Sequence, residues 1–538
     1  MRYAYSVAAV RAAEHSLLAQ QNFADELMRL AARGVAATAA AMLGPGRRVS
    51  ILVGPGGNGG DGLYAGAFLA EDGYSVEAIL AADSAHEPAL QAFTAAGGTI
   101  VHSLEVADLL IDAVAGLSST RGLSGAPLSA YAEAKKRGVP VLAVDIPSGI
   151  NADTGVAATD AVEADVTISF GWARAGHVCA PECGAVVLCD LLLPGAPRSF
   201  AEELSATAEP VGHIANEPTI PLPYQWPTEP VLTGDQGQVS APKPVGCTGP
   251  ILDPTPGAKS TKYTGGVTAV CAGSNAFPGA GILAATGAVR ATPSMVRVVG
   301  NDSVVASLPE VVPHASAEEK VHAQAWVVGP GRGTGPEAAA ELRAVLARKL
   351  PTVIDADALT VLASNEDLRK LVHDHPCAVL TPHAGEFERL YTATLGRALD
   401  LSEGLSVRLQ ELAATLDCFV LHKGRITTVT APGQEIYGMN AGHSYAATAG
   451  SGDVLSGILG ATLAQLNFAE VDAKGIIAEI LHAAAIHQHA AAIAAHTPDG
   501  FGICSASQIA AAVPQAIARL LVMLSLIHIS EPTRLGMI

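Results

Sequence analysis

Short apolar runs alternate with longer amphipathic segments along the first part of the chain. Runs of this length are typical of buried strands, whereas the segments between them repeat their apolar residues with helical spacing. Strands that are joined through helices form a parallel sheet covered on both faces. The expected strands are 49–53, 75–80, 109–113, 139–145 and 166–170, and the expected helices are 8–20, 26–42 and 63–71.

The same alternation resumes after a proline-rich interval. Eleven of the 33 prolines lie between Pro210 and Pro256, a density that breaks helices and central strands. Because no short period repeats, the pattern predicts two different α/β domains, a Rossmann-like three-layer domain at 1–205 and a second at 225–522, joined by a linker at 206–224. The expected elements of the second domain are strands 267–272, 325–329, 352–355, 378–381 and 419–423, and helices 284–290, 337–348 and 454–466.

Composition fits this architecture and excludes some partners. Hydrophobic residues make up 49% of the chain but aromatic residues only 4%, and the 55 glycines suit α/β layers with tight turns. A net charge of −19 repels phosphate polyanions, so no nucleic-acid partner is expected, although helix starts can still hold a small phosphate. The 8 cysteines include no CxxC pair, which favours reduced thiols over a zinc site at Cys179, Cys183 and Cys189.

The chain shows no targeting or membrane segment by pattern. Residues 1–10 lack a basic-then-apolar signal layout, and the apolar run 520–529 is about half of the ~20 residues that span a membrane. We therefore expect a soluble, cytoplasmic protein without a membrane partner. Residues 525–534 resemble translated sequencing-adapter DNA, so 525–538 is predicted to be an artefactual tail outside the fold.

A glycine-rich segment follows the first strand of the sheet. Gly54, Gly56 and Gly59 satisfy the dinucleotide pattern GxGxxG, and Glu77 lies near the end of the next strand. Such a segment allows close backbone approach to a ligand, although a plain tight turn gives the same pattern. Neither interpretation requires Asn58 and Asp61 among the glycines.

Two further strands end in carboxylates. Asp112 precedes a Gly/Ser-rich loop, and Asp145 begins the segment Asp-Ile-Pro-Ser148-Gly. The carboxyl ends of parallel strands share one edge of a sheet, where ligands bind. Asn58, Asp112, Asp145 and Ser148 are therefore predicted to converge on one site.

The motifs GxxNGGDG, DAxxG and VDIPSG, in this order, resemble the NAD(P)H-hydrate epimerase family of the YjeF N-terminal type over residues 1–205. The resemblance implies that Asn58, Asp112 and Ser148 hold a potassium ion, whose preference for hard oxygen ligands fits these side chains. It also implies that Asp145 is the catalytic carboxylate and binds the hydrate. The other hydrate-binding residues that it implies are Gly57, Asn58, Gly59, Gly60, Asp61, Gly116, Leu117, Ser118, Ser119, Thr120, Arg121 and Gly122.

The segment departs from the family pattern at two positions. Gly57 replaces the usual second asparagine, and Arg174 stands where the family has lysine. Arginine keeps the charge but cannot become a neutral base, so a role for this position in proton transfer is not expected.

In the second half, Gly450-Ser-Gly-Asp453 precedes an apolar helix and offers an anion-binding helix start beside a carboxylate. A simple N-cap turn would give the same local pattern. Other polar loops at strand ends of this domain contain Ala280, Gly331, Asp355, His383 and Lys423.

Together these loops resemble the ADP/ATP-dependent NAD(P)H-hydrate dehydratases of the ribokinase-like superfamily over residues 225–522. The resemblance implies that Asp453 is the catalytic base, that Mg²⁺ takes part, and that ADP is the co-substrate. His383 alone could instead be a core histidine. The implied nucleotide contacts are Lys423, Gly424, Arg425, Ile426, Thr427 and Gly452, and the implied hydrate contacts are Ala280, Gly331, Gly333, His383 and Asp453.

The two resemblances imply repair of the hydrated nucleotides NADHX and NADPHX. The first domain would epimerise the R and S hydrates, and the second would dehydrate the S form while ADP is converted to AMP and phosphate. A sugar or vitamin kinase fused to a Rossmann dehydrogenase, and a catalytically silent first half, are the alternatives. The sequence leaves open whether the chain forms a homo-oligomer and which of the two hydrates it prefers.

Overall fold

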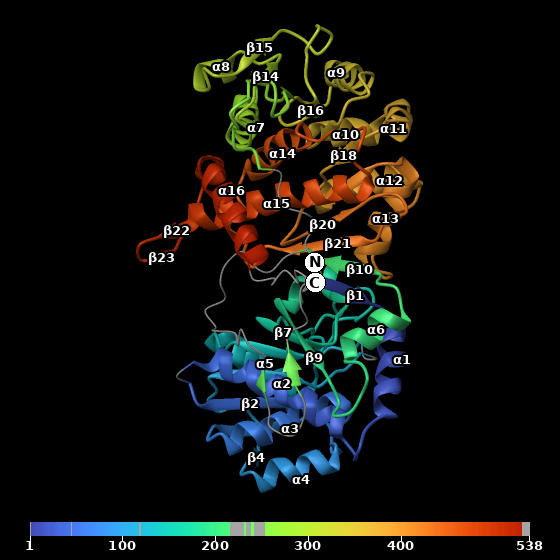
Figure 1. The fold of residues 1–538 in the computed structure, drawn as a ribbon, viewed down its shortest axis with the longest axis vertical. Helices are drawn as coiled ribbons and strands as arrows, with labels where there is room; N and C mark the ends of the chain where they lie inside the picture. The colour runs from blue at the N-terminus through green and yellow to red at the C-terminus, as the bar shows by residue number, and fades with distance from the viewer. Residues whose placement is uncertain are drawn as a thin grey trace, which may run out of the picture. The chain divides into compact units, whose positions relative to one another are not determined.

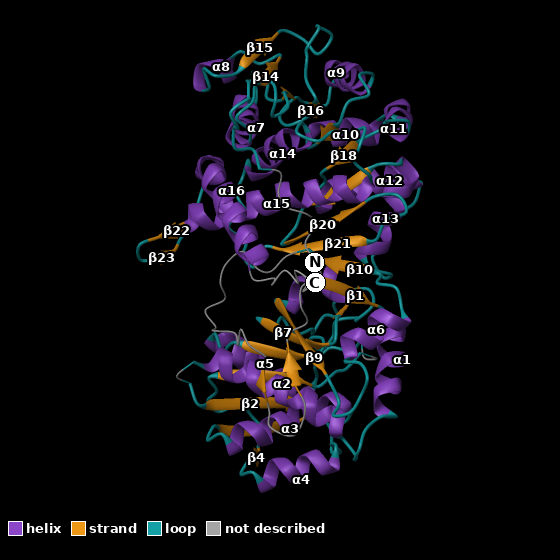
Figure 2. Cartoon of the chain, in the orientation of Figure 1, coloured by secondary structure: helices purple, strands orange, loops and turns teal. Residues whose placement is uncertain are grey.

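The computed structural model describes residues 2–44, 46–117, 120–215, 231–232, 238–240 and 253–529, with side chains up to residue 521 except for those of 231–232 and 238–240. The described residues divide into two compact units. The first is drawn from the range Met1–Val245 with Leu401–Ser406, and the second from Gly246–Asp400 with Val407–Ile538. Figure 1 traces their elements along the chain, and Figure 2 separates helices from strands.

The first unit is built on a mainly parallel sheet. Strands β2 to β7 and β9 pair in parallel, while β12 joins β9 in antiparallel orientation. Across the sheet the strands are β11 (Val231–Leu232), β12 (Gln238–Ser240), β9 (Ala185–Leu191), β7 (Val166–Phe170), β6 (Val141–Val144), β5 (Leu109–Ala113), β2 (Arg48–Val53), β3 (Ser75–Leu80) and β4 (Thr99–Ile100). The remaining elements are α1 (Val7–Leu18), α2 (Glu26–Leu43), α3 (Gly57–Glu71), α4 (Glu87–Ala95), α5 (Gly125–Arg137), α6 (Phe200–Thr207), β1 (Arg2–Tyr5), β8 (Ala173–Arg174) and β10 (Gly212–Ile214).

The strand order reverses between β2 and β5. From β2 the chain proceeds to β3 and β4 on one side, whereas from β5 it proceeds to β6 and β7 on the other. Because parallel crossovers are right-handed, α3 and α4 cover one face of the sheet and α5 covers the opposite face. The crevice at this reversal is where ligands bind in open α/β sheets, and it lies beside the ends of β2 and β5.

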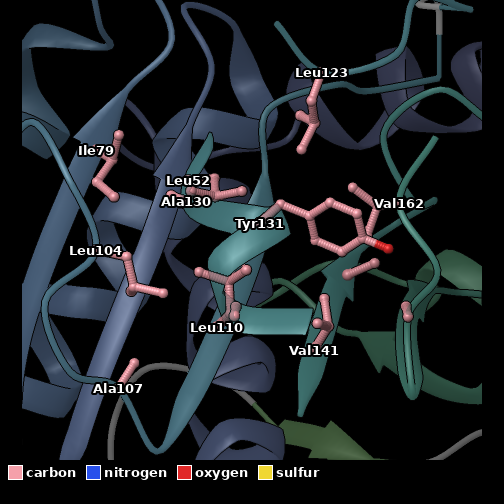
Figure 3. Packing of buried hydrophobic residues seen from close by; sticks show 13 residues of the cluster. Leu52, Ile79, Leu104, Ala107, Leu110, Leu123, Ala130, Tyr131, Val141 and Val162 are labelled. Atoms are coloured by element: carbon pink, nitrogen blue, oxygen red, sulfur yellow. The ribbon is translucent and has the colours of Figure 1, made fainter. Parts of the chain in front are cut away.

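One core cluster fixes α5 to the sheet (Figure 3). Leu52, Leu110 and Val141 of three neighbouring strands are at most 3% exposed and pack with Tyr131 of α5. Tyr131 keeps its hydroxyl satisfied, since the Oη accepts a hydrogen bond of 2.8 Å from the backbone N–H of Glu163. This packing holds the strand ends, and the loops that follow them, in fixed positions.

The second unit has a parallel sheet with an antiparallel extension. Here β13 (Thr268–Cys271) lies between β14 and β16, so the order again reverses at β13 and β16. The other strands of this sheet are β15 (Val312–His314), β14 (Val296–Val299), β16 (Ala325–Val328), β17 (Thr352–Ile354), β18 (Ala378–Leu380), β19 (Phe419–His422), β20 (Ile426–Thr430) and β21 (Ile436–Asn440). A short hairpin, β22 (His496–Thr497) and β23 (Gly500–Phe501), stands apart from it.

Two groups of helices pack around this sheet. Helices α7, α14, α15 and α16 contact one another, whereas α9, α10, α11 and α12 form a second packed group. The bounds are α7 (Pro278–Ala291), α8 (Ser303–Ser307), α9 (Pro336–Leu346), α10 (Asp357–Ser364), α11 (Glu366–His373), α12 (Ala384–Leu395), α13 (Leu405–Leu416), α14 (Ser451–Leu463), α15 (Ala473–Ala495) and α16 (Ala506–Ile529). Helix α15 is long and apolar enough to cross a membrane, but 83% of its apolar window is buried inside the protein, which is the position of a core helix.

Two helices begin earlier than their predicted starts. We expected a loop up to Gly62, whereas α3 begins at Gly57 and takes Asn58 and Asp61 into its first turns. Glycine's low helix propensity is overridden by packing, because a Cβ at Gly62 would lie 2.6 Å from the Cβ of Ala113. Likewise α14 begins at Ser451, so Asp453 lies inside the helix rather than before it.

Two irregular segments predicted from the sequence contain regular structure. Strand β10, in the proline-rich interval and the range predicted as linker, pairs with β1, because Gly212–Ile214 itself contains no proline to break a ladder. Residues 216–224 of that range lie outside the described residues. Helix α16 continues to Ile529 and includes the start of the predicted tail, since neither proline nor glycine occurs between 515 and 529; residues 530–538 lie outside the description.

Candidate active sites

In the first unit, Asn58 links the two strand-end loops on either side of it. Its Nδ2 donates hydrogen bonds to the backbone oxygens of Ala115 (2.6 Å) and Val144 (2.9 Å). The side chain reaches them because α3 starts directly after β2, at the reversal of strand order. Both N–H groups of the amide are thereby used, and its Oδ1 is left as an oxygen donor for a ligand.

Asp112 and Ser148 form a buried pair beneath these loops. Asp112 is 1% exposed, and its two carboxylate oxygens accept from the hydroxyl and the backbone N–H of Ser148, both at 2.7 Å. Burial raises the pKa of Asp112, while the hydrogen bonds from Ser148 act in the opposite direction. No ion pair joins Asp112 to a basic side chain among the described residues, so this buried carboxylate suits a small cation.

Asp145 is held in an uncommon backbone conformation. Its φ of 66° lies in the left-handed region, which few non-glycine residues adopt outside functional sites. The Oδ1 forms an ion pair of 2.6 Å with Nη2 of Arg174, which is buried. His177 Nε2 lies 2.9 Å from the backbone oxygen of Asp145, which fixes the turn further. Arg174 therefore compensates the charge of Asp145, a role that was not predicted from the sequence.

A cavity of about 290 Å³ brings part of the predicted set together. Of the predicted residues, Gly57, Asn58, Asp61, Gly116, Leu117 and Asp145 line it. Gly60 and Gly122 instead have packing roles, since a Cβ on either would clash, with Met28 and Asp160 respectively. Gly59, Thr120 and Arg121 do not appear in the lining, and Ser118 and Ser119 lie outside the described residues.

Helix α1 contributes residues to this cavity that the sequence analysis missed. Arg11 and Glu14 line it, on the helix that Val10, Ala13 and Leu17 anchor in the core. Glu14 directly follows the apolar Ala13, but this pattern alone does not mark a cavity residue. Helix α1 was predicted, but nothing in its sequence shows that it lies beside the strand ends.

Asp61 is the most perturbed acid of this cavity. Burial raises its pKa well above the usual range, and the carboxylates of Asp145 and Glu14 raise it further. The carboxyl group of Asp61 therefore keeps its proton to a higher pH than an ordinary aspartate, and in that form it can donate a hydrogen bond.

In the second unit, the loops after β13 and β16 meet at the reversal of strand order. The backbone N–H of Gly273 donates to the oxygen of Pro330 at 2.6 Å. Gly331 has a φ of 63°, and a Cβ there would lie 2.8 Å from the Cβ of Ala280. Two of the predicted hydrate contacts, Ala280 and Gly331, are thus adjacent. Gly333 follows in the same loop, where its N–H donates to Asp357 Oδ2 at 2.8 Å.

Asp453 lies in the first turn of α14, among acidic neighbours. Burial is the main cause that raises its pKa to about 7, followed by the carboxylate of Asp355, whereas the ammonium group of Lys423 opposes the shift. A carboxyl group with this pKa can accept a proton at neutral pH more readily than an ordinary aspartate. It also stands at a helix N-terminus, where a phosphate is favoured.

Lys423 is positioned by a buried carboxylate that the predicted site set left out. Its Nζ lies 2.7 Å from Oδ1 of Asp355, whose Oδ2 accepts a 2.6 Å hydrogen bond from Ser456 Oγ on α14. Asp355 is 1% exposed. Burial alone would lower the pKa of Lys423, but Asp355 and Glu386 raise it, so the ammonium form prevails. Asp355 thus ties the end of β19 to the helix that carries Asp453.

The predicted nucleotide loop divides into an accessible turn and a buried strand. Lys423, Gly424 and Arg425 connect β19 to β20, and a Cβ at Gly452 would lie 3.4 Å from Lys423 Nζ. Ile426 and Thr427 belong to β20 and are buried. Their side chains are therefore less accessible to a nucleotide than those of the turn.

His383 is not a core histidine, because its side chain is 59% exposed. It caps α12, where its Nδ1 accepts from the backbone N–H of Gly385 at 3.1 Å. Its Nε2 lies 3.5 Å from Glu386, which also lies 3.8 Å from Lys423. The histidine is therefore next to the Lys423 cluster and open to a ligand.

Within the described part of the chain, no group of three or more His, Cys, Asp or Glu residues is arranged to hold a metal ion. No disulfide bond joins the described cysteines, which include Cys179, Cys183 and Cys189.

Two families match the chain, one in each half. Residues 24–176 match the family described as YjeF-related protein N-terminus, and residues 268–507 match the family described as NAD(P)H-hydrate dehydratase. The chain is therefore a two-part α/β enzyme, with a YjeF-type first unit and a second unit of the NAD(P)H-hydrate dehydratase family.

Relatives match this arrangement over almost their full length. The chain is 38% identical to the bifunctional NAD(P)H-hydrate repair enzyme of Corynebacterium glutamicum, over 96% of this chain and 99% of that protein. It is 40% identical to the enzyme of the same name from Mycobacterium tuberculosis, over 86% of this chain and 89% of the relative. The chain belongs to the family of bifunctional NAD(P)H-hydrate repair enzymes. The predicted family and α/β fold class are confirmed.

Among solved structures, the chain is similar to an ADP/ATP-dependent NAD(P)H-hydrate dehydratase from Bacillus subtilis that was co-crystallised with ATP and Mg²⁺. The identity is 25% and the TM-score 0.42, over 50% of this chain and 94% of the other.

Proposed function

We propose that the chain repairs hydrated NADH and NADPH in the cytoplasm. The first unit interconverts the R and S hydrates, and the second dehydrates the S hydrate with ADP. The observation that carries the proposal is Asp453, a half-buried carboxyl group with a pKa of about 7 at the start of α14, beside Lys423. It is suited to take the proton of a hydroxyl group while a phosphoryl group is transferred to that oxygen.

The chemistry of dehydration follows from the leaving group. Hydroxide leaves poorly, so the terminal phosphoryl group of ADP is first transferred to the hydrate oxygen. The carbon–oxygen bond then breaks with phosphate as the leaving group, a ring proton is lost, and AMP, phosphate and the reduced nucleotide result. Lys423 and the N–H groups at the start of α14 would hold the transferred phosphate.

The release of free phosphate tests the proposed function. Purified protein incubated with S hydrate, ADP and Mg²⁺ should release one phosphate and form one NADH for each hydrate consumed. A stable phosphorylated product without NADH formation would instead identify a kinase.

Magnesium is proposed to bind together with the nucleotide. Asp355, Asp357 and Glu386 supply the oxygen donors that Mg²⁺ prefers, and the charges of all three act on the nearby base Asp453. Mg²⁺ is usually held by one or two carboxylates plus substrate phosphates, which agrees with the lack of a complete protein cage among the described residues. When bound, the ion would neutralise charge on the transferred phosphate.

Nucleotide use gives one testable prediction. We expect ADP with Mg²⁺ to support dehydration with a higher kcat/KM than ATP, as the resemblance to this dehydratase family implies. The measurement is the appearance of NADH absorbance from S hydrate at matched concentrations of the two nucleotides. An equal or higher kcat/KM with ATP would overturn the preference and leave the reaction unchanged.

Potassium is proposed to bind at Asn58, Asp112 and Ser148. The buried and unpaired Asp112 carboxylate and the free amide oxygen of Asn58 support this, because monovalent cations favour such oxygen donors. Replacing K⁺ by Li⁺ should slow the conversion of R hydrate to S hydrate and leave the ADP-dependent step unchanged. Chiral chromatography without ADP measures the first step, and NADH formation from pure S hydrate measures the second.

The variant Asp112→Asn sharpens this prediction. It keeps the side-chain volume but removes the charge, so its slow epimerisation should not respond to K⁺. Epimerisation that is equally fast in K⁺ and Li⁺ in the wild-type protein would contradict the potassium site.

A further inference from the structure

Glu14 occupies one wall of the cavity in the first unit. It lies on α1, whereas Asp61 lies on α3 and Asp145 directly follows β6. Glu14 is half-buried, yet no hydrogen bond or ion pair joins it to another described residue. A carboxylate that lines a cavity and has no protein partner can hydrogen-bond to a ligand that enters the cavity. Glu14 also precedes residues 24–176, the part of the chain that matches the YjeF-related family.

Few basic side chains are available to balance the carboxyl groups of this cavity. Arg174 already forms a 2.6 Å ion pair with Asp145. Burial raises the pKa of Glu14, and Asp145 raises it further, while Arg174 and Arg11 pull it down. These opposing influences leave Glu14 able to exchange a proton with a ligand, and its titration is coupled to that of its neighbours.

Inversion at the hydrated carbon needs two proton-transferring groups. The hydroxyl group sits on the carbon bonded to the ring nitrogen, so the carbon–oxygen bond can break while the nitrogen lone pair stabilises the planar cation. One group donates a proton to the departing hydroxyl, which leaves as water. A second group takes a proton from the water that adds to the other face, and the balance of atoms and charge is restored. Asp145 supplies only one of these groups.

We propose that Glu14 is the second acid/base residue of the epimerase site and acts together with Asp145; this inference rests on the proposed epimerase function. Protonated Glu14 donates to the departing hydroxyl, and Asp145 accepts the proton of the entering water. In the reverse direction the two exchange roles. Asp61 keeps its proton more firmly and serves as a hydrogen-bond donor to the bound hydrate.

The test is the conversion of pure R hydrate to S hydrate without ADP, corrected for the spontaneous rate. Glu14→Gln keeps the side-chain size and should lower kcat by about two to four decades, the usual effect of removing an acid/base group, with little change in KM. The wild-type kcat should show a bell-shaped pH profile, and the variant should lose one limb. Glu14→Asp, which restores a carboxylate on a shorter side chain, should recover both limbs at a reduced rate. The charged groups around the cavity that contribute to this profile are Arg11, Asp25, Asp61, Asp145 and Arg174.

A matched control is Glu203→Gln on α6. Glu203 accepts a 2.9 Å hydrogen bond from Ser16 of α1 and does not line the cavity, so its loss removes a carboxylate beside the same helix. This variant should epimerise at the wild-type rate. A wild-type kcat and both limbs in Glu14→Gln would overturn the assignment of Glu14. If the wild-type protein does not accelerate R-to-S conversion at all, the proposed epimerase function fails instead.

Discussion

Replacing Asp453 with asparagine should lower kcat for ADP-dependent dehydration of S hydrate by about two to four decades, the usual cost of losing a general base. Asparagine keeps the shape of the side chain at the start of α14 but cannot accept the proton of the hydrate hydroxyl. The phosphate site formed by Lys423 and the helix start is retained, so KM for ADP should change little. The measurement is NADH formation from pure S hydrate under saturating ADP and Mg²⁺.

The pH dependence of kcat tests whether Asp453 is this base. A base with a pKa of about 7 is protonated below that pH, so wild-type kcat should fall about tenfold for each pH unit below 7 and level off above it. The residual rate of Asp453→Asn should lack this limb. Wild-type turnover in the variant, or an unchanged acid limb, would show that another group is the base.

Measurements of stability show whether Asp453→Asn loses activity because it lacks the base or because it unfolds. The pKa of Asp453 rises from 3.8 to about 7 on folding, so the unfolded chain releases this proton first and stability falls as pH increases between these values. Above pH 7 the ionised carboxylate of Asp453 lowers the free energy of unfolding by the full amount, whereas asparagine has no charge to bury. Asp453→Asn should therefore melt no lower than the wild-type protein at pH 8. Asp367→Asn, on the exposed face of α11, is the control and should keep full activity.

The strand positions could be predicted well from local pattern. The predicted strands 75–80, 109–113 and 166–170 coincide with β3, β5 and β7 of the structure, because continuous apolar runs are required where both faces of a sheet are covered. Helix starts were less predictable. Helices α3 and α14 begin at Gly57 and Ser451 in glycine-rich segments of low helix propensity, because glycines further along them pack closely, Gly62 against Ala113 and Gly457 against Ala284. Such packing is not visible in a local pattern.

The site residues divide in the same way. Asn58, Asp112 and Ser148 could be placed together, because the carboxyl ends of neighbouring parallel strands share one edge. Glu14 could not, since α1 precedes the sheet and no sequence rule positions it over those ends. The role of Asp355 was also missed, because it depends on a 2.7 Å contact with Lys423, 68 residues away along the chain.

Because the two units are proposed to catalyse different steps, R hydrate should remain unconverted when Asp145 is replaced. Asp145 is the proposed carboxylate of the epimerase, and inversion needs an acid/base group but no nucleotide. Asp145→Ala should therefore consume S hydrate with ADP at the wild-type rate and leave R hydrate, which disappears only through spontaneous interconversion. Chiral chromatography of the residual pool, after incubation of a mixed hydrate with ADP, measures both forms at once.

The left-handed backbone conformation of Asp145 makes asparagine the better second substitution for testing its role in proton transfer. Alanine at a φ of 66° is strained, and its short side chain leaves the buried Arg174 without its carboxylate partner, so local unfolding could mimic loss of catalysis. Asparagine tolerates the left-handed region and can still accept a hydrogen bond from Arg174, yet it cannot take up a proton. Asp145→Asn should therefore melt closer to the wild-type protein than Asp145→Ala and strand the R hydrate to the same extent. If R and S hydrates disappear together at wild-type rates in the asparagine variant, Asp145 is not the carboxylate that moves the proton.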